Sequence, residues 1–168
     1  MLTEKKPPLV GLVMGSDSDL PIMREATATL DSLGVPWEMT IASAHRSPRL
    51  ASSYAQTARD RGLKVLIAGA GYAAHLAGVL AAETILPVIG LPLSGSPLNG
   101  FDSLLSTVMM PSGVPVATVT IGGAQNAAVL ATQILALSDE TLANNLLKFK
   151  ARLAQKVEEK AANLKQNG

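Results

Sequence analysis

The stretch VLIAGAGYAAHLAGVLAAE, residues 65–83, decides the fold class. Its first four residues are a short apolar run typical of a buried strand, Gly69 to Gly71 predict a tight turn, and residues 73–83 predict a helix. Residues 65–82 carry no formal charge and reach the minimum length of a membrane span, but the glycines divide them into two elements. We therefore predict one half of a β-α-β unit here and no membrane segment.

The same alternation of apolar runs and helical segments continues along the chain, and Gly34 and Gly62 close two of the helices. The predicted strands are residues 9–14, 37–41, 65–68, 88–91 and 116–121, and the other predicted helices are residues 21–33, 48–61, 126–137 and 140–164. Strands that each lead into a helix predict a three-layer α/β fold with a five-stranded parallel sheet. A flavodoxin-like strand order, 2-1-3-4-5, suits this length, and a Rossmann order stays open.

The composition limits the classes of function. With 168 residues the chain has the size of one domain, which we take as residues 1–168 with a flexible lead-in at 1–8. The 14 basic and 13 acidic residues nearly balance and aromatic residues make up 3%, so we expect no nucleic-acid partner. The absence of cysteine excludes disulfides and thiolate chemistry, and few metal ligands are present, so we expect no metal. The lead-in lacks the apolar core of a secretory signal, and we expect a cytoplasmic protein with no membrane partner.

Three loops are expected to hold the functional site. In parallel sheets, ligands bind at the carboxyl ends of the strands near the point where the strand order reverses, and the loops after the first three strands meet there. These loops contain residues 15–19, 43–46 and 69–75. Small hydroxyls, glycines, one arginine and both histidines of the chain would gather at one edge, which indicates a small anionic substrate.

His45 and Arg46 are the first candidates for chemistry. Histidine can both give and take a proton near neutral pH, and arginine offers a planar fork of donors for a phosphate or carboxylate. The plain alternative for His45 is a structural histidine bonded to a backbone carbonyl. His75 lies in a helical run and either supports the site or only packs and caps beneath it.

The first loop, residues 15–19, precedes a predicted helix. Ser18 or Asp19 can cap that helix with no ligand involved. Together with Ser16, the same residues beside the free N–H groups of a helix start also form a ready phosphate site. The sequence alone leaves both interpretations open.

Two familiar motifs are incomplete. Residues 69–74 match the dinucleotide fingerprint G-x-G-x-x-A, but the acidic residue expected about 20 residues later is missing from residues 90–93. The segment from Gly15 lacks the second glycine of a nucleophile elbow, and no histidine follows His75. Dinucleotide binding and serine hydrolysis are therefore disfavoured.

Several motifs together resemble the class I N5-carboxyaminoimidazole ribonucleotide mutases, the PurE family of de novo purine synthesis. They occur in order as Gly15-Ser16-x-Ser18-Asp19, Ser43-Ala44-His45-Arg46, Ala68 to Gly78, Asp102 to Ser106, and Met110 to Val116. The resemblance implies an isomerase that moves a carboxylate from the exocyclic N5 of a phosphorylated aminoimidazole ribonucleotide to C4 of its ring. It also implies a homo-octamer that needs no cofactor and no metal.

The resemblance further implies roles for single residues. His45 would be catalytic and move protons. The ribose 5'-phosphate end would be held by Ser16, Ser18, Asp19, Ser43 and Arg46, and the base and carboxylate pocket would be lined by Ala70, Gly71 and Leu76. His75 and Tyr72 are supporting candidates, although Tyr72 replaces a glycine usual in the family and Ala77 replaces a proline.

Two other functions stay open. A class II-like aminoimidazole ribonucleotide carboxylase would use free CO2, but the class II enzymes usually carry lysine where this chain has Arg46. A non-catalytic nucleotide-binding relative would result if Tyr72 blocked the carboxylate pocket.

The last segment, residues 140–164, predicts a long helix with a regularly spaced apolar face. The apolar positions are Leu142, Leu146, Phe149, Leu153 and Val157. This face can pack on its own sheet, but the helix exceeds what one side of a five-stranded sheet covers. We therefore expect it at a subunit interface, where the resemblance also places it.

Overall fold

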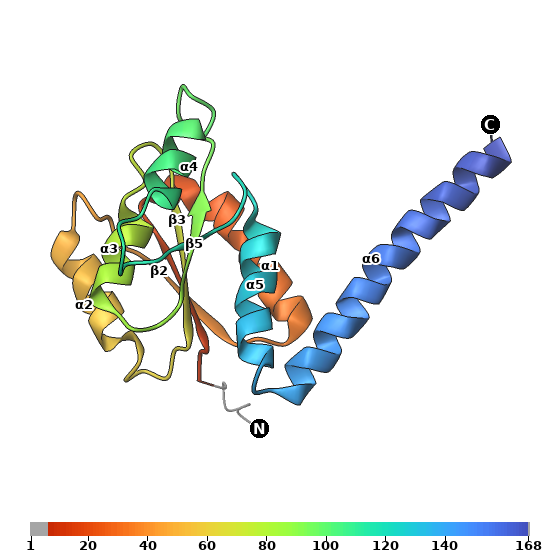
Figure 1. The fold of residues 1–168 in the computed structure, drawn as a ribbon, viewed down its shortest axis with the longest axis horizontal. Coiled ribbons are helices and arrows are strands. Elements are labelled where there is room, and N and C mark those ends of the chain that lie inside the picture. Colours follow the sequence, from red (N-terminus) through yellow and green to blue (C-terminus); the bar gives the residue numbers. More distant parts are fainter. Residues whose placement is uncertain (1–6, 168) are drawn as a thin grey trace.

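A computed structural model describes residues 7–167, the last two of them by their backbone alone. The lead-in expected at residues 1–8 therefore lies outside the described residues, except for Pro7 and Pro8. Figure 1 shows a central sheet with helices on both sides and one long helix that extends away from them.

Five parallel strands form the sheet, in the order β2-β1-β3-β4-β5. The flavodoxin-like order is therefore confirmed and the Rossmann order is excluded. Met14, at the end of β1, is level with Ile41 of β2 and Gly69 of β3, so the loops after these strands leave the sheet at the same edge. The strands are β1 (Val10–Met14), β2 (Trp37–Ile41), β3 (Val65–Ala70), β4 (Val88–Pro92) and β5 (Ala117–Thr118).

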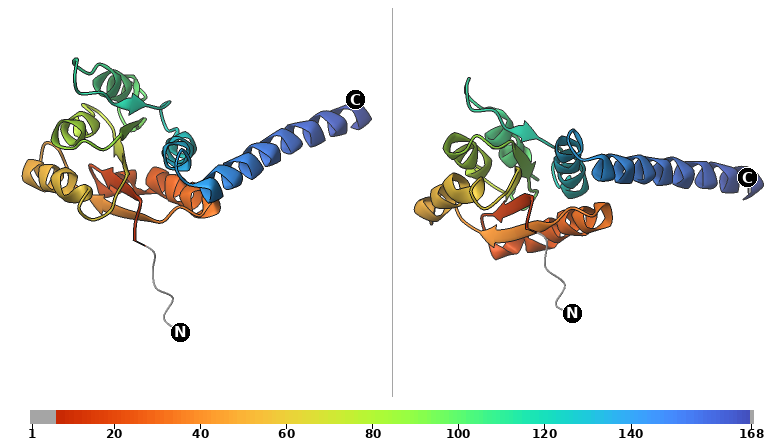
Figure 2. Two further views of the ribbon diagram at one scale, coloured as in Figure 1. Left: turned by 60° about the horizontal axis from the view of Figure 1, so that its bottom comes forward. Right: turned by 90° about the horizontal axis from the view of Figure 1, so that it is seen from below.

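Helices cover both faces of the sheet, as a three-layer α/β fold requires (Figures 1 and 2). Alternate strand residues face opposite sides: Leu12 packs in the core with α1 and α5, and Val13 packs in the core with α2 and α3. The helical elements are the 3-10 turn η1 (Asp17–Asp19), α1 (Leu20–Leu33), α2 (Pro48–Ala58), α3 (Leu76–Glu83), α4 (Phe101–Val108), α5 (Ala124–Ala136) and α6 (Glu140–Asn167).

The fifth strand is shorter than expected. Instead of residues 116–121, only Ala117 and Thr118 form it. The chain then turns, because the N–H of Gly123 donates to the carbonyl of Thr120 at 2.9 Å. This turn leads directly into α5 and leaves no room for a longer strand.

Three further boundaries differ from the expectation. β3 continues through Ala70 and absorbs part of the expected glycine turn. α3 begins only at Leu76, because residues 73–75 form a turn in which the N–H of His75 donates to the carbonyl of Ala73 at 2.8 Å. α2 ends at Ala58, and its expected last turn leads irregularly into Gly62, which has φ 94°.

The sequence does not predict α4, because its hydrophobic pattern is inverted. The hydroxyls of Ser103 and Thr107 are buried and donate to the carbonyls of Leu93 at 2.8 Å and of Ser103 at 2.7 Å. The exposed side chains of the helix are the apolar Phe101, Leu105 and Val108. α4 therefore presents an apolar surface to its surroundings.

Gly90, in the middle of β4, lets α4 pack closely on the sheet. An added Cβ there would overlap Cγ2 of Thr107 and lie 2.8 Å from Cγ1 of Val116. Both neighbours are β-branched and stiff at χ1. Gly69 in β3 differs, because an added Cβ would meet Sδ of the flexible Met23 at 2.5 Å.

α6 packs on the rest of the chain through its first turns only. Leu142 and Leu146 are buried in the core with α1 and α5, and Nδ2 of Asn145 donates to the carbonyl of Leu33 at 3.0 Å. The rest of the helix extends outward (Figures 1 and 2), and Leu153 is 45% exposed there. Packing on its own body is thus confirmed for the start of α6. Across residues 7–167, no helix has the length and apolarity needed to cross a membrane.

Candidate active site

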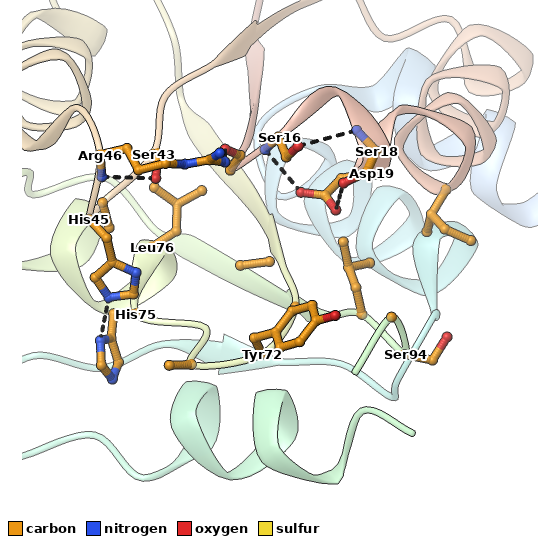
Figure 3. A pocket seen from close by; sticks show the side chains of 18 residues that line it. Ser16, Ser18, Asp19, Ser43, His45, Arg46, Tyr72, His75, Leu76 and Ser94 are labelled. Carbon is orange, nitrogen blue, oxygen red and sulfur yellow. Dashed lines mark hydrogen bonds between the residues drawn. The ribbon is translucent and has the colours of Figure 1, made fainter. Parts of the chain in front are cut away.

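A pocket of about 660 Å³ opens at the edge where β1, β2 and β3 end (Figure 3). Every residue singled out in the sequence as a site candidate lines it, so the three loops meet as expected. These residues are Ser16, Ser18, Asp19, Ser43, His45, Arg46, Ala70, Gly71, Tyr72, His75 and Leu76.

The first loop forms a capping box at the start of η1. The hydroxyl of Ser16 accepts from the N–H of Ser18 at 3.4 Å, and the N–H of Ser16 donates to Oδ2 of Asp19 at 3.1 Å. Asp19 also occupies the N-cap position of α1 but makes no side-chain cap hydrogen bond there, so the expected capping of that helix by Ser18 or Asp19 is wrong; the element capped by a side chain is the start of η1, by Ser16. Because Ser16 and Asp19 also line the pocket, capping fixes the loop in place beside it.

Asp19 is the acidic group of the pocket with a perturbed pKa. Partial burial raises the pKa of its carboxyl above the ordinary value of 3.8. Hydrogen bonds from Ser16 and Ser18 and the charge of Arg46 act in the opposite direction. Burial is the largest cause, so the carboxyl keeps its proton to a higher pH in the folded chain.

Arg46 connects the second loop to the first. Its guanidinium donates to the carbonyl of Gly15 at 3.0 Å, and its backbone N–H donates to the hydroxyl of Ser43 at 3.2 Å. A guanidinium has five N–H donors, so the bond to Gly15 leaves donors free to face an anion. The arginine is thereby held at the pocket with its charge exposed.

His45 and His75 form a direct pair at one side of the pocket (Figure 3). Nε2 of His45 lies 2.8 Å from Nδ1 of His75, and the rings are nearly perpendicular at 81°. In such a pair one ring donates and the other accepts. His75 occupies the N-cap position of α3 but makes no side-chain cap hydrogen bond, so the capping alternative for His75 is wrong.

The structure gives His45 a different partner from the one expected of a structural histidine. The hydrogen-bond partner of His45 is the ring of His75, not a backbone carbonyl. The bond uses Nε2 of His45, and the other ring nitrogen of His45 faces the interior of the pocket (Figure 3).

Tyr72 combines an unfavourable backbone with an exposed side chain. Its φ of 54° is left-handed, which costs about 1–2 kcal/mol for a residue with a Cβ. Its side chain is 59% exposed and lines the pocket.

The sequence did not indicate the loop after β4. Ser94 and Gly95 line the pocket together with Leu93, at the end of that strand. Small polar residues directly after a predicted strand are the signal that could have identified them. Ile22 of α1 is another lining residue with no chemical signal in the sequence.

The donor set does not suit a metal ion. Within the described part of the chain, no three histidine, cysteine, aspartate or glutamate side chains gather closely enough to hold one. The polar groups of the pocket are instead hydroxyls, backbone amides, one guanidinium, the histidine pair and the carboxyl of Asp19, of which the donors suit an organic anion.

The chain is similar to proteins of known name. It matches the family model described as AIR carboxylase over residues 9–156. It is 54% identical over 168 residues to the N5-carboxyaminoimidazole ribonucleotide mutase of Pyrococcus horikoshii. This alignment covers 100% of this chain and 94% of the relative. It is 59% identical over 141 residues to the protein of the same name from Bacillus subtilis, with 83% and 87% covered. The crystal structure of Treponema denticola PurE superimposes with a TM-score of 0.85 at 29% identity and covers 94% of this chain and 99% of that one.

Proposed function

The chain belongs to the AIR carboxylase family, and on this premise we propose that it is an isomerase of de novo purine synthesis. It converts N5-carboxyaminoimidazole ribonucleotide to 4-carboxy-5-aminoimidazole ribonucleotide, the reaction that the names of its relatives describe. The observation that carries the proposal is the presence of a histidine pair and an arginine-serine anion site in one pocket. Arg46 in place of the class II lysine supports the mutase over a carboxylase that uses free CO2.

The two ends of the pocket suit the two ends of this substrate. The ribose 5'-phosphate end is held by Ser16, Ser18, Asp19, Ser43 and Arg46. Hydroxyls, backbone N–H groups at a helix start and a guanidinium are the donors that phosphate prefers. Ala70, Gly71 and Leu76 line the base and carboxylate end, where a small planar ring needs apolar surface. The phosphate thereby orients the ring toward the histidine pair.

His45 moves the proton that the isomerisation requires. As imidazolium it protonates N5 while the bond from N5 to the carboxylate carbon breaks, which leaves aminoimidazole ribonucleotide and CO2. C4 then attacks the CO2 and forms the new carbon–carbon bond. Neutral His45 removes the proton from C4 and restores the aromatic ring, so the proton lost from C4 replaces the one given to N5. One residue thus acts first as acid and then as base.

His75 is a positioning residue in this scheme. Its Nδ1 holds Nε2 of His45 at 2.8 Å, which fixes the orientation of the His45 ring and directs its other nitrogen toward the substrate. A ring fixed before substrate binds needs no reorganisation at the moment of proton transfer.

Confinement of CO2 is the second task of the protein. A reactant held at contact distance gains a large effective concentration, and CO2 that escaped to water would lose it. Gly71, Tyr72 and Ala73 line the pocket, and their backbone N–H groups would stabilise the charge of the carboxylate.

We further propose that the chain acts as one domain in a cytoplasmic homo-octamer. Two apolar surfaces support self-association: the exposed face of α4 and the outward half of α6. Leu153 and Val157 on α6 are 45% and 66% exposed, although a helix with apolar residues at this spacing normally packs them. A second copy of the chain would cover both surfaces.

The test is the reaction itself. The N5-carboxylated substrate is made in place from aminoimidazole ribonucleotide, ATP and bicarbonate by the synthetase that forms it, and the C4-carboxylated product is followed by its ultraviolet absorbance. We expect product to form faster than without the protein and in proportion to its concentration. Product formation at the protein-free rate would contradict the proposal.

A further inference from the structure

Tyr72 has a backbone conformation that its residue type disfavours. Among residues 7–167 only Tyr72 and Asn99 are non-glycine residues with positive φ, at 54° and 52°. Asparagine tolerates this region, but a bulky aromatic residue rarely enters it. Strained residues of this kind persist where the surroundings or the function require them.

The fold does not provide the compensation for Tyr72. Its side chain is 59% exposed, so it gains little from packing. Within the described residues its hydroxyl has no hydrogen-bond partner, and a glycine would adopt the same backbone without strain. Because Tyr72 lines the pocket, we look for the reason in what enters the pocket.

The ring stands at the reactive end of the pocket. In Figure 3 it lies between His75 and Ser94, and its hydroxyl points away from the histidine pair. The apolar Leu76 and Leu93 line the same pocket. A planar ring bound in this pocket would meet these apolar side chains and the phenol of Tyr72.

We propose that the ring of Tyr72 covers the carboxylate end of the bound substrate and retains the CO2 released there. This inference rests on the proposed isomerase function. CO2 carries no charge and no donor, so polar groups hold it weakly, and steric cover decides whether C4 captures it or water takes it. The phenol ring, not its hydroxyl, supplies this cover.

Three variants separate the ring from the hydroxyl and from the backbone. Tyr72→Phe keeps the ring and removes the hydroxyl. Tyr72→Gly removes the ring and relieves the backbone, and Tyr72→Asn removes the ring but keeps a side chain that tolerates positive φ. We expect Tyr72→Gly to melt no lower than the wild type, so that its kinetics report the pocket and not unfolding.

The measurement is the partition of CO2 between capture and escape. Product labelled with carbon-13 in its carboxylate is incubated with excess unlabelled bicarbonate. The synthetase, ADP and phosphate are added, so that the reversed synthetase reaction cleaves the N5-carboxylated compound to aminoimidazole ribonucleotide and bicarbonate and forms one ATP from ADP and phosphate. Two quantities are measured: the amount of label lost from the remaining product and the amount of ATP formed. Their ratio gives the number of CO2 molecules that escape for each carboxylate that is transferred. We expect this ratio to rise at least about fivefold in Tyr72→Gly and Tyr72→Asn, because lowering the barrier to CO2 escape by about 1 kcal/mol raises the escape rate by this factor. In Tyr72→Phe we expect the ratio to stay within about twofold of the wild type.

The outcomes separate this proposal from the function on which it rests. A wild-type protein that forms no ATP refutes the isomerase and the cover together. A wild type that transfers directly, with the same ratio in all variants, refutes the cover alone. An equal rise of the ratio in Tyr72→Phe would assign the effect to the hydroxyl and would overturn the proposal. Loss of all turnover in Tyr72→Gly would assign the ring to substrate binding and would overturn it as well.

Discussion

Replacement of His45 by asparagine separates chemistry from binding and from folding. The side chain of His45 is exposed and is bonded to the ring of His75. Its removal leaves no cavity in the core, so the free energy of unfolding should change by no more than about 0.5 kcal/mol. Asparagine keeps a polar side chain of similar reach but cannot carry a proton between two atoms.

The expected loss is therefore confined to the rate of the reaction. General acid and base catalysis contributes about 10²- to 10⁴-fold, so we expect kcat of His45→Asn to fall by about this factor. The residues proposed for the phosphate are untouched, so the dissociation constant of aminoimidazole ribonucleotide should stay within about twofold of the wild type, a change of under 1 kcal/mol.

Arg46→Ala is the matched control, because it removes the neighbouring side chain and leaves His45 in place. A hydrogen bond to a charged group is worth about 1.5–3 kcal/mol, so the dissociation constant should rise about 10- to 150-fold. Isothermal titration gives both dissociation constants, and steady-state kinetics give both values of kcat. Equal loss of binding and kcat in His45→Asn, or full kcat without the histidine, would refute the assignment.

Three further predictions concern stability and assembly. Gly90→Ala should lower the free energy of unfolding in urea by about 1–3 kcal/mol because its neighbours are stiff, and Gly69→Ala should lower it less; equal losses would contradict the packing described. Burial raises the pKa of Asp19 above 3.8, so the folded chain binds its proton more tightly and the free energy of unfolding falls as the pH rises from 3.8 through the raised pKa. Asp19→Asn should remove this decline, whereas parallel stability curves for variant and wild type would argue against it. Leu153→Glu should reduce the mass measured by light scattering if α6 joins subunits, and an unchanged mass would exclude α6 from the interface.

The sequence predicted the centre of the sheet well because β1, β3 and β4 are buried on both faces. Continuous apolar runs such as residues 65–68 have few alternatives in a chain of this size, and Gly34 marks a helix end that the structure confirms with φ 76°. The strand order did not follow from this pattern: the chain length favoured the flavodoxin-like order, the Rossmann order stayed open, and the structure decides between them.

The sequence failed where local chemistry overrides pattern. α4 was not predicted because it buries hydroxyls bonded to carbonyls and exposes its apolar residues. The late start of α3 could not be predicted either, because residues 73–75 resemble the helix in composition and give no signal of the turn between Ala73 and His75.

The candidate site was predicted almost completely at the level of residues and only partly at the level of contacts. The three loops meet because parallel strands end at one edge, so Ser16, Ser43 and Gly71 line one pocket. The bond between His45 and His75 joins residues thirty positions apart and depends on side-chain geometry that no sequence pattern records. Ser94 was missed because its loop carries no titratable group.

Direct transfer of the carboxylate is the central claim, and carbon-13 NMR tests it most directly. Product labelled in its carboxylate is given to the wild-type protein with excess unlabelled bicarbonate, the N5-carboxylating synthetase, ADP and phosphate. The account predicts that ATP forms while the remaining product keeps its label. Rapid loss of label without ATP would show a carboxylase that uses free CO2 and would contradict the account.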